Sequence, residues 1–398
     1  MHAVASGEAS SYVSLFWIAL AAVGAPLLAR ASGGYVPATV LLIVLGVVIG
    51  PGVGHLASPE GLAVLKQLGL GFLFLLAGYE LHVPDLFGRQ GGFAWIAWAV
   101  GFVVATVVSL VITSESLITA AAFGLTVTST ALGALVPILK ERGLMGHRMG
   151  RSVMIHGAVG ELGPVIAMAI LLGGRTPTAA LMTLATFGVA ALVLVAIPGG
   201  MIRRFPEAFR KVVGPSSSST QMGMRMVVLA LTGLMALAGA LNLDVVLGAF
   251  AAGIILHRLT PPDDERESER LETVANSFFV PAFFVLSGMS LDLKAVVNRP
   301  WLLVSVLAAI LFIRGGAVYL SERILPTGSG LDNNERIRLS LYSAAGLPII
   351  VAVTEVAVAN NLMPADIAAI LIAAGSLSLL IFPYVAARIR RHATPLAA

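Results

Sequence analysis

Glu161 is the residue in this sequence whose type and surroundings point most directly to chemistry. It stands in the middle of an otherwise apolar stretch, GAVGELGPVIAMAI (Gly157–Ile170), whose small residues let neighbouring backbones approach closely. Burial favours the neutral acid and a nearby cation favours the carboxylate, so a buried Glu can bind a proton or a metal cation in competition. Pro164 cannot donate a hydrogen bond to the carbonyl of Gly160, and we expect that free oxygen to complete a cation site.

Three further ionisable residues lie inside apolar stretches, where a charge is costly and usually paired or functional. For Arg314 and Glu355 we expect an ion pair that supplies countercharge when the site is empty, with Arg314 reaching toward Glu161. His156 precedes Glu161 by five residues, which is about 140° around a helix. We therefore interpret His156 as a satisfied structural histidine, with an auxiliary role at the site as the alternative.

Two apolar stretches contain residues that interrupt helices. One holds four hydroxyl side chains in the five residues Thr126–Thr130, followed by Pro137, and the other holds Gly346 and Pro348 at its centre. Unwound backbone inside a membrane is tolerated where it is buried or lines a cavity, and there it can bind ions. The pattern predicts two discontinuous helices, with helix breaks at Pro137, Gly346 and Pro348 and a further break at Pro164. The alternative is a pair of simple kinks whose hydroxyls bond back to their own helix.

The composition explains why these few charges are informative. Of 398 residues, 58% are hydrophobic and 12% are charged, and the mean hydropathy is +0.93. Such a chain is a polytopic membrane protein rather than a soluble enzyme. It has no cysteine, and it contains no HExxH, GxSxG or paired-aspartate constellation. We therefore predict a protein that is not an enzyme, needs no cofactor and binds no nucleic acid.

Apolar stretches long enough to cross a bilayer, roughly 17 to 25 residues, can be counted along the chain. Twenty of the 25 basic residues fall in alternate loops, which places the N-terminus outside and the C-terminus in the cytoplasm. The polar segment 212–222 and the mixed-charge segment 261–272 are predicted to be solvated connectors. The thirteen predicted spans are 11–29, 35–51, 62–82, 93–112, 117–139, 150–172, 178–199, 223–241, 244–258, 274–291, 301–321, 337–359 and 364–387.

Two glycine alignments reveal an internal repeat. Gly78 matches Gly288 at an offset of 210 residues, and Gly46 matches Gly253 at an offset of 207. Each offset corresponds to seven helices, an odd number, so the two copies run in opposite orientation, as is common in secondary transporters. The predicted organisation is a single transmembrane unit, 1–398, with a first repeat at 11–172, a linking helix at 178–199 and an inverted second repeat at 223–387.

Three motifs carry a resemblance to a known family. They are the segment from Thr126 to Ile166, with its Ser-Thr pair followed by KERG, and the glycine motifs FLLAGYEL (Phe74–Leu81) and FFVLSGMSLDL (Phe283–Leu293). Together they resemble the monovalent cation:proton antiporter-2 family, which includes bacterial sodium/proton antiporters and the membrane domain of Kef-type potassium-efflux systems. The resemblance covers nearly the whole membrane part.

The resemblance implies an all-α sodium/proton antiporter fold, in which a core with two crossed discontinuous helices moves like an elevator against a dimerisation domain. It also implies a homodimer. The resemblance aligns Glu161 with the family's essential carboxylate. It aligns Thr128, Ser129 and Thr130 with the hydroxyl groups that bind the cation in that family. The chain departs from the family at Gly160, where Asp, Asn or Gln is usual, and in having Glu rather than Asp next. No nucleotide-binding domain is expected after Arg391.

These observations predict a transporter in the cytoplasmic membrane that exchanges a monovalent cation for protons. The expected cation is Na⁺, with K⁺ and Li⁺ as alternatives, and one carboxylate suggests one-for-one, electroneutral exchange. Two other readings remain open. The same inverted repeat could carry a small organic solute, or the protein could be a membrane scaffold, although a scaffold would not explain matched helix breaks or a buried Glu161.

Overall fold

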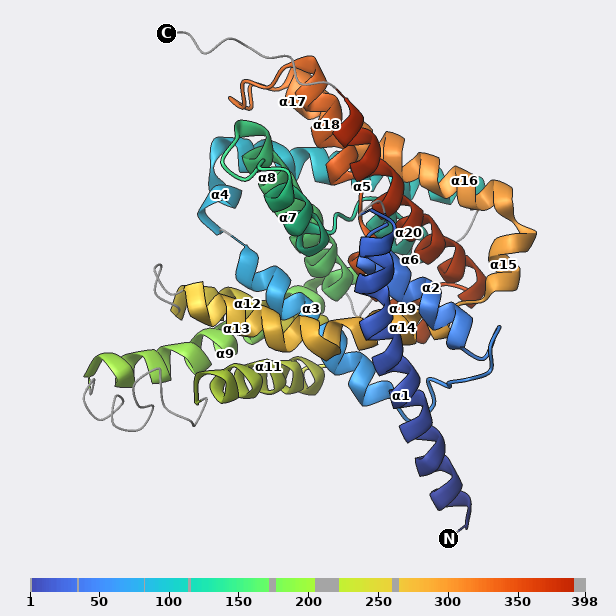
Figure 1. Ribbon diagram of the computed structural model, residues 1–398. Coiled ribbons are helices and arrows are strands. Elements are labelled where there is room, and N and C mark those ends of the chain that lie inside the picture. The colour runs from blue at the N-terminus through green and yellow to red at the C-terminus, as the bar shows by residue number, and fades with distance from the viewer. Residues whose placement is uncertain are drawn as a thin grey trace. The chain divides into compact units, whose positions relative to one another are not determined.

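The computed structural model describes residues 2–33, 36–81, 83–113, 116–171, 177–204, 222–259 and 265–389, and the regular elements in these ranges are helices. Figure 1 shows them in chain order: α1 (His2–Ala31), α2 (Ala38–Ile49), α3 (Ala63–Glu80), α4 (Val83–Phe87), α5 (Arg89–Thr113), α6 (Leu117–Val127), α7 (Leu132–Glu141), α8 (Arg148–Leu171), α9 (Pro177–Arg204), α11 (Met222–Ala240), α12 (Val245–Leu259), α13 (Glu265–Val274), the π-helical turn η1 (Ala275–Phe279), α14 (Val280–Met289), α15 (Leu293–Asn298), α16 (Pro300–Ala309), the π-helical turn η2 (Ile310–Gly315), α17 (Gly316–Ile324), α18 (Asn333–Ser343), α19 (Leu347–Ala359) and α20 (Ala365–Arg388).

Some of these helices, alone or joined end to end with the next element, reach membrane-spanning length. Within the described residues, ten helical stretches are long and apolar enough to cross a bilayer by length and composition. Three shorter apolar helices coincide with three further predicted spans: Ala38–Ile49, Leu181–Val193 and Val245–Arg258. Each predicted span therefore lies largely on a helix, and the all-helical membrane fold is confirmed, whereas the count of thirteen crossings stays a prediction.

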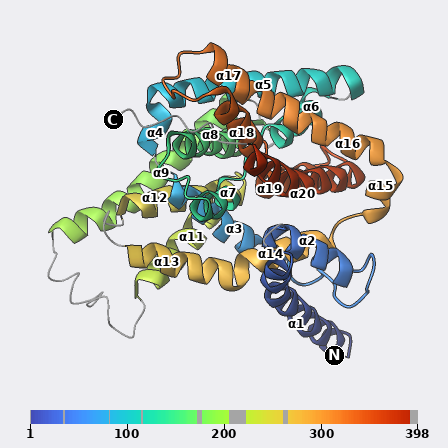
Figure 2. The same cartoon turned by 45° about the horizontal axis from the view of Figure 1, so that its top comes forward.

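The chain divides into two compact units. The first comprises Met1–Gly61, His82–Met168 and Phe284–Ala398. Within it, α5 packs on α6 and on α17, and α20 packs on α16, α18 and α19 (Figure 2). The second comprises Leu62–Leu81 and Ala169–Phe283, and within it α3 and α11 both pack on α12. All of the residues singled out as candidate site residues lie in the first unit.

Glycines at the repeat positions set two close helix packings. In the second unit, a Cβ added at Gly78 of α3 would overlap a backbone oxygen of α12, and one added at Gly253 of α12 would overlap a backbone oxygen of α3. In the first unit, α2 and α14 are related in the same way through Gly46 and Gly288. The α2–α14 and α12–α3 pairs are equivalent under the repeat alignment, which agrees with the inverted repeat of the fold; the repeat boundaries stay a prediction.

Both predicted interruptions are present. Helix α6 ends at Val127 and α7 begins at Leu132, while α18 ends at Ser343 and α19 begins at Leu347. Gly346 is the N-cap of α19, and Pro348 stands in its first turn, where its missing N–H has no helical partner to lose. The prediction of two discontinuous helices is therefore confirmed, with Gly346 and Pro348 at the second break.

Two other prolines were wrongly predicted to break helices. Pro137 lies inside α7, after the interruption rather than at it, and Pro164 lies inside the continuous helix α8. An internal proline removes one hydrogen bond, and the remaining bonds of a long helix can carry the chain through it.

The mixed-charge segment 261–272 was also partly misread. Its residues from Glu265 onward belong to α13, which continues directly into η1 and α14. The segment is therefore a helical extension of the following span over its described part, rather than a loop. Most of the predicted connector 212–222 lies outside the described residues.

Candidate functional site

The two helix breaks meet and satisfy each other's backbone groups. Unwound backbone inside a bundle leaves N–H and C=O groups that must find partners, because there is no water to take them. Three hydrogen bonds join the breaks: from Ala131 N to Ala345 O (2.6 Å), from Thr130 Oγ1 to Ser343 O (2.6 Å) and from Ser129 Oγ to Gly346 O (3.3 Å). The crossing is therefore held by direct contacts between residues more than 200 positions apart.

The hydroxyl side chains of the first break are fully engaged as donors. Thr128 Oγ1 donates to Gly124 O (2.7 Å), and Ser129 Oγ also lies 2.9 Å from Thr126 O. Both side chains are buried. Because each hydroxyl donates its single proton to a carbonyl, its lone pairs remain able to accept from a donor or to bind a cation.

One hydroxyl of the second break has no hydrogen-bond partner within the described part of the chain. It is the Oγ of Ser343, a residue with no exposed surface at the C-terminal end of α18. Buried polar groups without a partner are rare in folded proteins and often mark a ligand position. Nothing in the sequence singles out Ser343, because an orphaned hydroxyl becomes visible only once the contacts are known.

Glu161 lies on the part of α8 that docks against the first break, and 3% of its surface is exposed. The preceding residue makes the docking contact: Gly160 O accepts a hydrogen bond from Thr130 N at 2.9 Å. Pro164 does withhold the helical N–H from that carbonyl, as expected. That oxygen is not free, however, because the backbone of the break donates to it, and its part in a cation site stays a prediction.

Arg314 reaches into the crossing from the π-helical turn η2. Its Nε and Nη2 both donate to Thr130 Oγ1 at 3.1 Å, and Nη2 also donates to His156 O at 2.7 Å. A Cβ at Gly160 would overlap both Arg314 Nη2 and Thr130 Oγ1. The glycine thus makes room for the guanidinium one residue from Glu161, which gives a physical reason for the departure from the family pattern at this position.

Glu355 occupies a different contact. It lies on α19 and accepts a hydrogen bond from Ser287 Oγ of α14 at 3.1 Å. The predicted pairing of Arg314 with Glu355 stays a prediction, as does the reach of Arg314 toward the carboxylate of Glu161. What the structure establishes is that the guanidinium binds the break itself and the backbone of α8.

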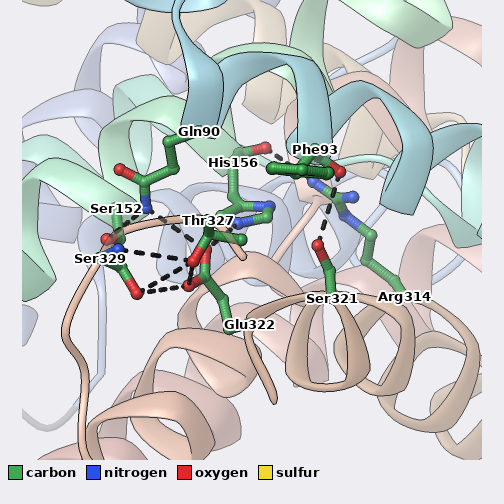
Figure 3. Close-up of polar contacts among 9 residues, drawn as sticks. All are labelled: Gln90, Phe93, Ser152, His156, Arg314, Ser321, Glu322, Thr327 and Ser329. Atoms are coloured by element: carbon green, nitrogen blue, oxygen red, sulfur yellow. Dashed lines mark hydrogen bonds and ion pairs between the residues drawn. The ribbon is translucent and has the colours of Figure 1, made fainter. Parts of the chain in front are cut away.

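One buried acidic residue near the site was not among the residues predicted from the sequence. Glu322 of α17 has 3% of its surface exposed and forms an ion pair with His156, with 2.9 Å between Oε1 and Nε2 (Figure 3). The predicted span 301–321 ended just before it, and the neighbouring Arg323 made the position look interfacial. The side chain of His156 has a fixed partner at Nε2, and that partner is titratable; the structural role predicted for His156 stays a prediction.

Comparison with known proteins gives the chain a family. It matches the model of the family described as "Sodium/hydrogen exchanger, transmembrane" over residues 18–389. This label differs from the antiporter-2 family that the motifs suggested, and both labels name cation:proton antiporters.

Two individual proteins resemble the chain. A protein named for Na(+)/H(+) antiport, YjbQ of Bacillus subtilis (strain 168), is 25% identical over 320 residues, which cover 75% of this chain and 50% of YjbQ. The chain therefore spans about half the length of this curated relative. The solved structure of the sodium proton antiporter MjNhaP1 from Methanocaldococcus jannaschii at pH 8 matches with a TM-score of 0.68 at 18% identity and covers 94% of this chain and 98% of that one. The structural match shows a shared fold.

Proposed function

The chain belongs to the sodium/hydrogen exchanger family, and from this membership and the geometry of the crossing we propose that it exchanges a monovalent cation for protons across a membrane. Glu161 is the group for which the two compete. As a carboxylate it attracts a cation, and as an acid it is neutral, so one occupant must leave before the other binds. The cation arrives on one side and the proton on the other through alternating access.

The observation that carries the proposal is a buried carboxylate next to a crossing of two unwound helices. The first break supplies the side-chain oxygens of Thr128 and Ser129, whose protons are committed to carbonyls. Thr130 Oγ1 is left out of the ligand set, because it accepts from two nitrogens of Arg314. The second break supplies Ser343 Oγ, which has no partner within the described residues. Such all-oxygen surroundings suit a hard monovalent cation. Gly160 is left out of the ligand set, because Thr130 N already binds its carbonyl.

Na⁺ is the cation we propose, ahead of K⁺ and Li⁺, because the names of both relatives refer to sodium. A single carboxylate at the site supports one-for-one exchange. We further propose that the part carrying the crossed breaks moves as a body, in the manner of an elevator, in a homodimer of the cytoplasmic membrane with the N-terminus outside and the C-terminus in the cytoplasm.

The test uses purified protein in liposomes that contain a pH-sensitive dye. Addition of Na⁺, K⁺ or Li⁺ salts should move protons, and Glu161→Gln should abolish that movement, because an amide can neither carry the proton nor balance the cation. Glu60→Gln makes the same chemical change at an exposed position and should leave transport intact. A dye that stays silent with all three cations in the wild-type protein would remove the proposal and favour the organic-solute alternative.

A further inference from the structure

The pair formed by His156 and Glu322 has no role in the exchange as proposed above. Its two side chains come from α8 and α17, and neither has exposed surface. The 2.9 Å contact joins a histidine, the side-chain type whose ordinary pKa lies nearest to neutrality, to a carboxylate, in surroundings where an uncompensated charge is expensive. We propose that this pair is a second proton-binding site, separate from Glu161, and that its proton controls how strongly a cation binds at the crossing.

The carboxylate of Glu322 is held in its ionised form by donors on both oxygens. Thr327 and Ser329, from the loop after α17, donate to Oε2 at 2.7 and 2.6 Å. Gln90 Nε2 of α5 approaches Oε1 at 3.3 Å, beside the imidazole of His156 (Figure 3). A carboxylate with several donors has little reason to carry a proton itself. The imidazole Nε2 must then donate to Oε1, so Nε2 keeps a proton in both charge states of the ring.

The exchangeable proton therefore belongs on the other ring nitrogen. His156 Nδ1 is buried and has no hydrogen-bond partner in the part of the chain that the structure describes. Without a proton there, the pair carries one net negative charge, and with a proton it is neutral. Proton binding thus changes the buried charge by one unit without requiring a new side-chain contact.

Arg314 connects the pair to the crossing. Its Nη2 donates to the backbone oxygen of His156 at 2.7 Å and, at 3.1 Å, to Thr130 Oγ1 of the first break. His156 interacts electrostatically with Arg314 as well as with Glu322. A proton on His156 therefore adds a positive charge beside that of Arg314, and the two together repel a cation at the crossing. The affinity for the cation should therefore fall as the pair takes up its proton.

Few other charges act on this pair. The charged groups near His156 are Glu322 of α17 and Arg314 of η2. The other side chains around the pair are uncharged: Gln90 of α5, and Thr327 and Ser329 of the loop after α17. Ser152 of α8 accepts a hydrogen bond from Gln90 at 2.7 Å. Near the start of α8, Arg151 is exposed and pairs with Asp85 of α4 at 2.9 Å, and Arg148 lies beside Gly330. The pair is thus a local unit rather than part of a wider titrating surface.

Proton binding can be measured without transport. In protein labelled with ¹⁵N-histidine, the imidazole signals of His156, assigned by their loss in His156→Asn, should change between about pH 5 and 9. In Glu322→Gln the imidazolium loses its counter-ion, and the change should disappear from that window. The signals of the exposed His147 are the control and should be the same in both proteins. A His156 signal that stays constant across the window in wild-type protein would overturn the proposal.

The link to the crossing rests on the proposed exchange function and needs a second measurement. In the dye-filled liposomes, the cation KM of wild-type protein should rise about fivefold or more from pH 8 to pH 6. His156→Gln, whose amide can still donate to Glu322, should reduce that dependence to the part caused by competition at Glu161, while a thermal unfolding scan shows a folded protein. A wild-type pH profile in this variant would refute the coupling. Silence of the wild-type dye signal would instead count against the exchange function and leave the histidine titration standing.

Discussion

The two helix breaks face each other but are built from different chemistry. The first, between Val127 and Leu132, presents hydroxyl side chains and backbone N–H groups, and it acts mainly as the donor. The second, from Ser343 to Gly346, has one hydroxyl, that of Ser343, followed by two alanines and a glycine, and it presents three carbonyls as acceptors. The inverted repeat therefore preserves the path of the backbone, while the residues at equivalent positions have become complementary to each other.

The difference teaches that a break needs a partner more than it needs a particular residue. Hydroxyls interrupt a helix by offering the backbone other partners. Small residues interrupt it by letting another chain segment approach. In this protein each method depends on the other, because the donors of one break end on the acceptors of the other. The comparison predicts that substitutions of the small residues destabilise the crossing through steric overlap. Substitutions of the hydroxyl residues should destabilise it through lost hydrogen bonds.

The largest effect is expected from Gly346→Ala. The added Cβ would lie 2.6 Å from both Ser129 O and Ser129 Oγ, and the backbone atom cannot move aside. We expect destabilisation of about 3 kcal/mol and loss of cation-driven proton movement, as measured by thermal unfolding in detergent and by the dye assay. Gly316→Ala is the control, because no atom lies within 4 Å of its added Cβ. Normal exchange by Gly346→Ala would show that the second break does not depend on close approach.

A smaller effect should separate bonds between the breaks from bonds within one of them. Thr130→Val removes the donor to Ser343 O and the acceptor of Arg314, so buried groups on two elements lose their partner. Thr128→Val keeps the shape and removes a bond to Gly124 within its own helix. We expect losses in unfolding free energy of about 2 kcal/mol and about 1 kcal/mol respectively. Equal losses would mean that the contact between the breaks adds no stability of its own.

The smallest change in stability should come from Ser343→Ala. Its hydroxyl has no partner within the described residues, so its removal should cost little folding energy. If the hydroxyl binds the cation, as proposed, the cation KM should still rise several-fold at unchanged thermal stability. An unchanged KM would assign cation binding to the first break and Glu161 alone.

Part of this architecture could be predicted from the sequence because it is local or periodic. The breaks follow from clustered hydroxyls and from Gly346 and Pro348, and the offset of seven helices links them. The glycine alignments likewise mark real packing positions, since Gly46 and Gly253 each contact a neighbouring helix backbone.

What failed depends on partners that are distant in the sequence. Pro164 shows that the carbonyl of Gly160 is released, but not that Thr130 N binds it. Glu322 stands at the end of an apolar stretch beside Arg323, and nothing local shows that His156 and Gln90 enclose it. Pro137 was predicted to break a helix because the sequence alone shows which hydrogen bond a proline removes. The hydrogen bonds that stabilise the actual break instead run to the second break, and the sequence does not show them.

The π-helical turn η2 joins α16 to α17 and contains one residue more than a regular α-helical turn would. A π turn is an α-helix with one residue inserted, so deletion of a single codon within Ile310–Gly315 would restore a regular α-helix. The π turn accommodates its extra residue within itself, so the helix after the deletion would keep its orientation and Glu322 would still meet His156. Arg314 stands within the turn and would lose its present position against Thr130. One in-frame codon therefore suffices for a lineage to alter the guanidinium at the crossing without removing the buried pair.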